Sequence, residues 1–130
     1  MKSKIRWLRI SYWAGAIGDF ALAILALNPE MMEVPSYCYP MGLFSAVAFS
    51  WGVMLILADR EPLERRWVLL PTILVGSLLL IAVLYSMYAG AISPSGSRLL
   101  NLILYPAMIA LWSFSYYNAR DIEQGGATHR

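Results

Sequence analysis

The sequence predicts an all-α protein, a transmembrane four-helix bundle. Hydrophobic residues make up 59% of its 130 residues and charged residues only 14%, a balance that does not suit a water-soluble domain. A helix of about 20 apolar residues crosses the hydrocarbon core of a bilayer, which is about 30 Å thick. Four apolar runs meet that length, and the lack of water in lipid favours helices for such segments. The predicted spans cover residues 7–27, 41–58, 67–91 and 99–117.

The distribution of basic residues predicts how these spans are oriented. Lys and Arg concentrate in the loops on the cytoplasmic side of membrane proteins. Both terminal segments and the loop between the second and third spans are basic. The two other loops have Arg98 as their one basic residue. We therefore expect one transmembrane domain over residues 1–130, with both termini and a polar tail at 118–130 in the cytoplasm. The net charge of +2 follows from this topology, so we expect no nucleic-acid partner.

The first span carries a stripe of small residues with one acid in it. Its apolar part exceeds the usual 7–15-residue core of a signal peptide, so we expect the span to be retained. Ser11, Gly15, Asp19 and Ala23 recur every four residues and share one face of a helix, and Gly18 lies beside them. Small residues let a second helix approach closely in a membrane. We therefore expect this face to pack against another helix.

The second span has a small-residue face of its own. Gly42, Ala46 and Ser50 recur every four residues, and further small residues lie near them at Ser45, Ala48 and Gly52. We expect Gly42 and Ala46 to be packing residues, as Gly15 and Gly18 are in the first span.

A charged turn follows the second span. We expect Pro62 to occupy the first turn of the third helix, where its missing N–H is not needed, and Glu61 to pair with Arg65 at i,i+4 spacing. The turn is either a solvated hairpin held by exposed ion pairs, each worth about 0–1 kcal/mol, or a docking site for a cytoplasmic partner or anionic lipid headgroups. Its marked residues are Asp59, Arg60, Pro62, Glu64, Arg65 and Arg66.

Prolines and hydroxyl residues mark the last two spans. Thr72 and Ser77 can bond back to the backbone of the third helix. Pro71 lies near the cytoplasmic end of that helix, and Pro106 lies inside the fourth span, where proline commonly produces a kink.

The counts of reactive residues argue against an enzyme. One cysteine, Cys38, cannot form an internal disulfide, and one histidine, His129, cannot supply a pair of haem ligands. The spans contain no cluster of carboxylates and histidines for a metal site, and the chain has no glycine-rich phosphate loop. We therefore expect no catalytic site, no metal and no cofactor.

The stretch "MGLFSAVAFSWGVMLILADREPLERR" resembles a family of small four-span prokaryotic integral membrane proteins of unassigned function. The similarity lies in a first span that ends near Asn-Pro, Met-Gly at the start of the second span and Trp-Gly late in it. The turn Asp-Arg-x-Pro-x-Glu-Arg after that span is its most distinctive part. The resemblance implies a four-span fold in the prokaryotic inner membrane and supplies no activity.

Asp19 is the polar residue that a functional account has to explain. A charged side chain near the bilayer centre costs about 2.5–3.5 kcal/mol on insertion scales. No Lys or Arg lies at a comparable depth in any predicted span, so the neutral form of the carboxyl group is favoured. The polar or aromatic residues expected nearest its depth are Ser50, Trp51, Ser77 and Tyr105.

Three hypotheses for Asp19 remain open. It locks helices together through a hydrogen bond to Ser50, Trp51 or a backbone carbonyl. Alternatively, it couples protons or cations in a small transporter or amphiphile-binding protein. As a third possibility, the chain is an accessory subunit, and Asp19 meets a polar or basic residue of a larger membrane complex. In each case we expect a bilayer environment and assembly with itself or with a membrane-protein partner.

Overall fold

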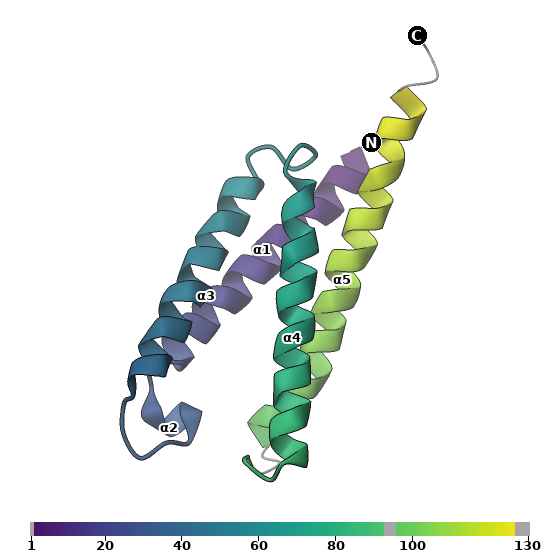
Figure 1. Ribbon diagram of the computed structural model, residues 1–130. Helices are drawn as coiled ribbons and strands as arrows, with labels where there is room; N and C mark the ends of the chain where they lie inside the picture. Colours follow the sequence, from purple (N-terminus) through teal and green to yellow (C-terminus); the bar gives the residue numbers. More distant parts are fainter. Residues whose placement is uncertain (1, 93–95, 127–130) are drawn as a thin grey trace. The chain divides into compact units, whose positions relative to one another are not determined.

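A computed structural model describes residues 2–92 and 96–126 of the chain (Figure 1). All regular secondary structure in these ranges is helical, and four of the helices are long and apolar enough to cross a membrane. The prediction of an all-α, four-span protein is therefore confirmed. The helices are α1 (Lys2–Leu25), α2 (Pro29–Met32), α3 (Tyr39–Ala58), η1 (Arg66–Val68), α4 (Leu69–Tyr88) and α5 (Gly96–Gly126).

The spanning segments differ from the predicted ones mainly at their ends. They are Lys2–Leu25, Tyr39–Ala58, Arg66–Tyr88 and Leu99–Arg120. Hydropathy detects the apolar core of a helix but not its polar extensions, because Lys, Arg, Gln and Glu are good helix formers in water. Helix α5 accordingly continues to Gly126 through most of the predicted polar tail, and residues 127–130 lie outside the described residues.

The chain divides into two compact units. One comprises Arg9–Arg65, which includes most of α1, all of α2 and α3, and the turn after α3. The other comprises Met1–Leu8 with Arg66–Arg130, which includes the start of α1 together with η1, α4 and α5.

Helices α1 and α3 pack closely within the Arg9–Arg65 unit. A Cβ atom built on Gly52 of α3 would lie 3.1 Å from the Phe20 ring and 3.3 Å from the carbonyl oxygen of Ala16, both in α1. The Ser45 hydroxyl donates to the Ala23 carbonyl oxygen at 2.7 Å. The absence of a side chain at residue 52 therefore allows this close approach. The buried residues of α3 are Met41, Ser45, Ala48, Gly52, Leu55 and Ala58.

This packing corrects the predicted small-residue face of α3. Ala46 and Ser50 are exposed, and Gly42 lies against the Tyr37 side chain rather than against another helix. Neighbouring residues of a helix are about 100° apart around its axis, so two adjacent small-residue stripes face different directions. The stripe that packs on α1 is the neighbouring one, which contains Ala48 and Gly52.

The two glycines singled out in α1 differ in their surroundings. Gly15 is buried, in agreement with the predicted packing role. Gly18 is half-buried, and no atom lies within 4 Å of the position where its Cβ would be. Its hydrogen side chain is therefore not required by a close helix contact.

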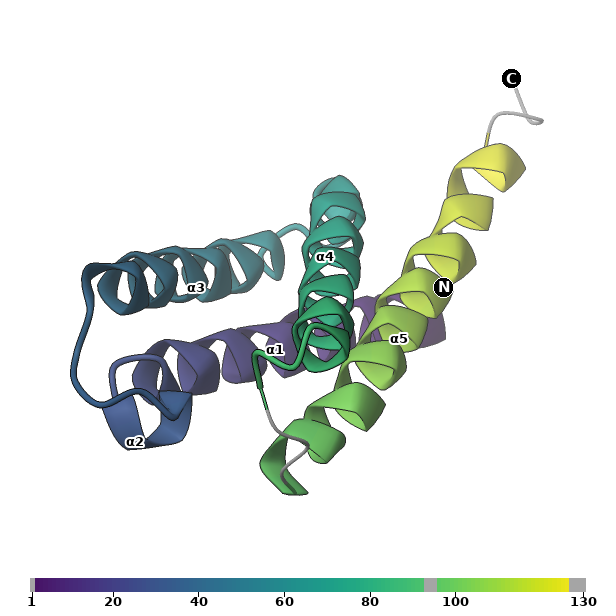
Figure 2. The ribbon, with the colours of Figure 1, turned by 60° about the horizontal axis from the view of Figure 1, so that its bottom comes forward.

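Helices α4 and α5 lie side by side in the other unit (Figures 1 and 2). A Cβ atom on Gly76 of α4 would lie 2.9 Å from the Trp112 ring of α5. Further along α5, the Ser115 hydroxyl donates to the carbonyl oxygen of Trp7 at 3.2 Å, and the Trp7 and Phe114 rings meet edge to face. These contacts attach the first residues of α1 to α5.

The hydroxyl residues of α4 behave as predicted. Thr72 donates to the Val68 carbonyl oxygen at 2.7 Å, and Ser77 donates to the Ile73 carbonyl oxygen at 2.8 Å. Such bonds satisfy the hydroxyl group inside its own helix. Pro71 lies in the first turn of α4, where its N–H is not needed, and Pro106 lies inside α5.

The turn after α3 places Pro62 differently from the prediction. Regular helix resumes only at Arg66, so Pro62 lies in the turn and not in the first turn of a helix. The Arg65 N–H bonds to the Glu61 carbonyl oxygen at 3.0 Å, which closes one helical turn that does not continue. The Pro62 carbonyl oxygen accepts a hydrogen bond from the Tyr12 hydroxyl at 3.0 Å, which ties the turn to α1.

Candidate functional site

Asp19 lies on the small-residue stripe of α1, as the sequence predicts. Ser11, Gly15 and Ala23 of this stripe are buried, and Asp19 among them is half-buried. It follows Arg9 by ten residues, about 15 Å along a helix, which places it well inside the apolar part of the span. Among the described residues, no hydrogen bond or ion pair reaches the Asp19 carboxyl group.

The expected hydrogen bond between Asp19 and Ser50 is absent from the described part of the chain. The Ser50 hydroxyl instead donates to the Ala46 carbonyl oxygen at 2.8 Å, within its own helix, and Ser50 is exposed. A serine in a helix readily satisfies its hydroxyl in this way, at the carbonyl four residues earlier. Ser77 does the same in α4, and Tyr105 belongs to α5.

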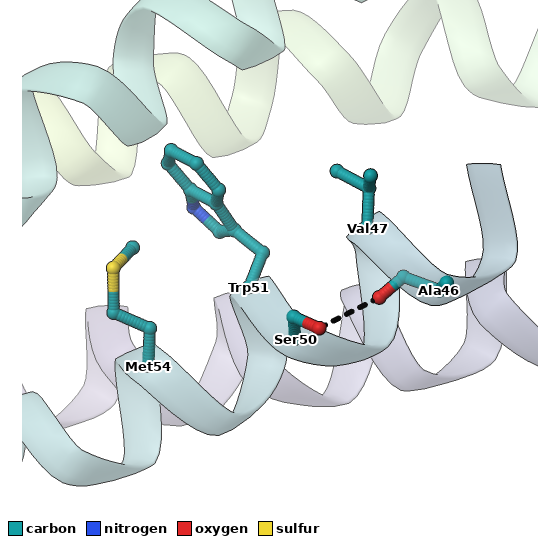
Figure 3. Close-up of a pocket in the computed structure, with 5 residues that line it drawn as sticks. All are labelled: Ala46, Val47, Ser50, Trp51 and Met54. Atoms are coloured by element: carbon teal, nitrogen blue, oxygen red, sulfur yellow. Dashed lines mark hydrogen bonds between the residues drawn. The ribbon is translucent and has the colours of Figure 1, made fainter. Parts of the chain in front are cut away.

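Ser50 and Trp51 meet at a groove along α3 (Figure 3). The groove has a volume of about 340 Å³, and its surface is mainly apolar. Figure 3 shows the Ser50 hydroxyl turned toward Ala46, while the Trp51 and Val47 side chains extend from the same side of the helix. The lining residues are Ala46, Val47, Ser50, Trp51 and Met54.

A polar cluster that the sequence reasoning missed joins α1 to the end of α3. Asp59 follows the last residue of α3; its Oδ2 accepts a hydrogen bond from the Trp13 indole N–H at 3.2 Å, and its Oδ1 lies 3.3 Å from Nε of Arg9. The Tyr12 hydroxyl adds the bond to Pro62. We call these five residues the α1–turn clasp: Arg9, Tyr12, Trp13, Asp59 and Pro62.

A sequence signal for the clasp exists in α1. Arg9 and Trp13 are four residues apart, and Tyr12 is three residues from Arg9, so the three polar-tipped side chains share one helix face. The packing of α1 against α3 determines which acidic residue these side chains contact. The spacing of residues within α1 does not determine this packing.

The predicted ion pair between Glu61 and Arg65 is present in the turn. Arg65 pairs with Glu61, with Nη2 2.7 Å and Nε 2.9 Å from Oε2, and also donates to the Leu57 carbonyl oxygen. The Arg66 side chain donates to the Ala119 carbonyl oxygen of α5 at 3.1 Å.

Arg60 and Glu64 are exposed, and neither makes an ion pair within the described residues. No group of three or more His, Cys, Asp and Glu side chains gathers there in a way that could hold a metal ion.

Comparisons with protein-family models, with curated proteins and with solved structures gave no match to this chain. The resemblance to a family of small four-span membrane proteins stays a prediction.

Proposed function

We propose that this small integral membrane protein acts through lateral helix packing, either with a second copy or with another membrane protein, and that Asp19 is the polar contact. The observation that carries the proposal is the position of Asp19, half-buried on the small-residue stripe of α1. The four apolar spans support a membrane location for the whole chain.

The energetics of a carboxyl group in lipid support this role. Placing it there costs about 2.5–3.5 kcal/mol on insertion scales, and acids in membrane helices usually pair with another polar group. Ser50, one of the two residues predicted first as partners, donates its hydroxyl to Ala46 instead. A partner helix that carries a basic or hydrogen-bond-donating residue at the same depth satisfies Asp19. The partner can belong to another copy of this chain or to a larger complex in which this chain is an accessory subunit.

Substitution of Asp19 tests the proposal. Asp19→Leu removes the polar contact and should dissociate the assembly while the isolated chain keeps its helical content and melting temperature. Asp19→Asn keeps a hydrogen-bonding group and should retain part of the assembly. Ser50→Leu, which replaces an exposed polar residue of α3, is the control and should leave the assembly intact.

The groove on α3 favours a second candidate, an amphiphile-binding protein or a small proton- or cation-coupled transporter. The mainly apolar lining of this open groove comes from α3 alone and includes the Trp51 indole, so an amphiphile would contact it along one side of its apolar chain. The chain has five tryptophans, so the difference in fluorescence between wild type and Trp51→Phe reports on occupancy, because a brominated amphiphile quenches indole fluorescence on contact. Saturable quenching that depends on pH in the wild type but not in Asp19→Asn would support this candidate over lateral packing.

A further inference from the structure

We propose that the α1–turn clasp and the adjacent Arg60 bind the phosphate group of an anionic phospholipid. Arg9 and Arg60 supply the guanidinium groups, and Asp59 positions Arg9.

Asp59 forms an ion pair with the guanidinium of Arg9 at its Nε atom. Its Oδ1 lies 3.3 Å from Nε, and the Trp13 indole fixes the other carboxylate oxygen at 3.2 Å. The Asp59 side chain is 19% exposed, whereas that of Arg9 is 57% exposed. Nε is one of three nitrogens in a guanidinium group, so both terminal amino groups of Arg9 remain available. The carboxylate thus orients a charged donor pair toward the surroundings of the protein.

Arg60 supplies the second guanidinium, at the position next to Asp59 in the chain. It is exposed and makes no ion pair within the described residues. The charges around it are largely paired, since Asp59 faces Arg9 and Glu61 faces Arg65.

Glu64 is an exposed acid of the same turn and opposes anion binding. The eight residues before Arg9 in the chain include three basic residues and no acid: Lys2, Lys4 and Arg6.

The clasp lies where lipid phosphates are found. The apolar span of α3 ends at Ala58, immediately before Asp59. Trp13 is 48% exposed, and tryptophan is enriched at the level of the lipid headgroups. Arginine binds phosphate through two parallel hydrogen bonds, a geometry that lysine cannot reproduce. A phospholipid headgroup is therefore the occupant that fits both the depth and the donors of the clasp.

Lipid titration of the delipidated, full-length protein in a neutral detergent tests the proposal. Short-chain phosphatidylglycerol is added, and binding is followed by native mass spectrometry and by the melting temperature. Wild type should bind it saturably, and Arg9→Lys and Arg60→Gln should each weaken binding about tenfold. Arg9→Lys keeps a cation beside Asp59, so its melting temperature without lipid shows that the clasp still folds. Arg120→Gln, an exposed arginine of α5, is the control and should bind as wild type does.

Three results would overturn the proposal. Equal binding of short-chain phosphatidylcholine would show that the anionic headgroup is not recognised. A rise in melting temperature with inorganic phosphate equal to that with phosphatidylglycerol would show that the site binds a free anion. Weakening by Arg9→Lys and Arg60→Gln that is no greater than that by Arg120→Gln would show that Arg9 and Arg60 form no specific site.

Discussion

Asp59 connects two helices at the point where α3 ends. Its carboxylate receives the Trp13 indole N–H and faces Arg9, and both partners come from α1. Hydrogen bonds to a charged group are stronger than those between neutral groups, and a donor left without its acceptor costs further free energy. Asp59 therefore contributes more to stability than an acid in a solvated turn.

Asp59→Ala should lower the free energy of unfolding by about 1–2 kcal/mol, because Trp13 loses its acceptor and Arg9 loses its ion-pair partner, while the site stays partly open to solvent. Thermal unfolding in detergent, followed by circular dichroism, measures the change. Glu64→Ala, which removes an exposed acid of the same turn, should change stability by less than about 0.5 kcal/mol. Equal effects of the two substitutions would show that the clasp does not stabilise the fold.

For Asp19, the spacing of residues in the sequence predicts the helix face on which it lies but not its hydrogen-bond partner. The recurrence of small residues every four positions predicts the face of α1 that holds it, and the burial of Gly15 and Ala23 agrees. The expected partner Ser50 follows from depth alone, and depth does not tell in which direction a side chain points. Ser50 is exposed, and its hydroxyl donates to the carbonyl oxygen of Ala46 in its own helix.

The packing of α3 on α1 is determined by a single stripe of small residues. Two such stripes lie next to each other on α3, and both look equally suitable in the sequence. The stripe with Gly52 is used, since Phe20 and the backbone at Ala16 occupy the space next to it. Only the three-dimensional fit of α1 distinguishes the two stripes.

A matched pair of substitutions tests this face of α3. Ala48→Leu should destabilise the protein by about 1–3 kcal/mol, because Ala48 is 7% exposed and its face packs on α1. Ala46→Leu, two residues away on the exposed side, should change stability by less than about 0.5 kcal/mol. Melting temperatures of both variants in the same detergent make the comparison. A larger loss of stability for Ala46→Leu than for Ala48→Leu would show that α3 packs through the face that the sequence predicts.

The contact between α4 and α5 gives a second matched pair. Gly76→Ala places a methyl group against the Trp112 ring, whereas Gly18→Ala places one in open space. Replacement of glycine by alanine favours the helix by about 1 kcal/mol in both variants. A difference in their stability therefore reports on overpacking at residue 76. We expect Gly76→Ala to be less stable than Gly18→Ala by about 1–3 kcal/mol in chemical unfolding. A difference near zero would mean that Trp112 moves away without cost.

At the scale of the whole molecule, the sequence predicts the number of spans well, because the apolar length needed to cross a bilayer is a strict physical requirement. The position of Pro62, in contrast, is not predicted correctly from the sequence. Its residue type suits the start of a helix, but its carbonyl oxygen is used by Tyr12, and helix resumes only at Arg66. The contacts of the clasp likewise join α1 to residues 46 or 50 positions later, so the local spacing of Arg9, Tyr12 and Trp13 does not show what they contact.

The orientation in the membrane is a further prediction for the whole molecule. Cys38 is exposed between α2 and α3 and is the protein's one cysteine, so it serves as a native label. If both termini are cytoplasmic, a membrane-impermeant maleimide should label Cys38 in intact cells. Glu64→Cys in a Cys38→Ser background should react only after permeabilisation. The opposite pattern would invert the predicted topology.

The most direct test of lateral packing through Asp19 is the mass of the assembly extracted from native membranes into lipid nanodiscs. Native mass spectrometry of the wild type should show this chain bound at fixed stoichiometry to a second copy or to another membrane protein. Asp19→Leu should release the chain as a folded monomer with an unchanged melting temperature. A wild-type chain that is monomeric, or an Asp19→Leu chain that keeps its partner, would contradict the proposed function.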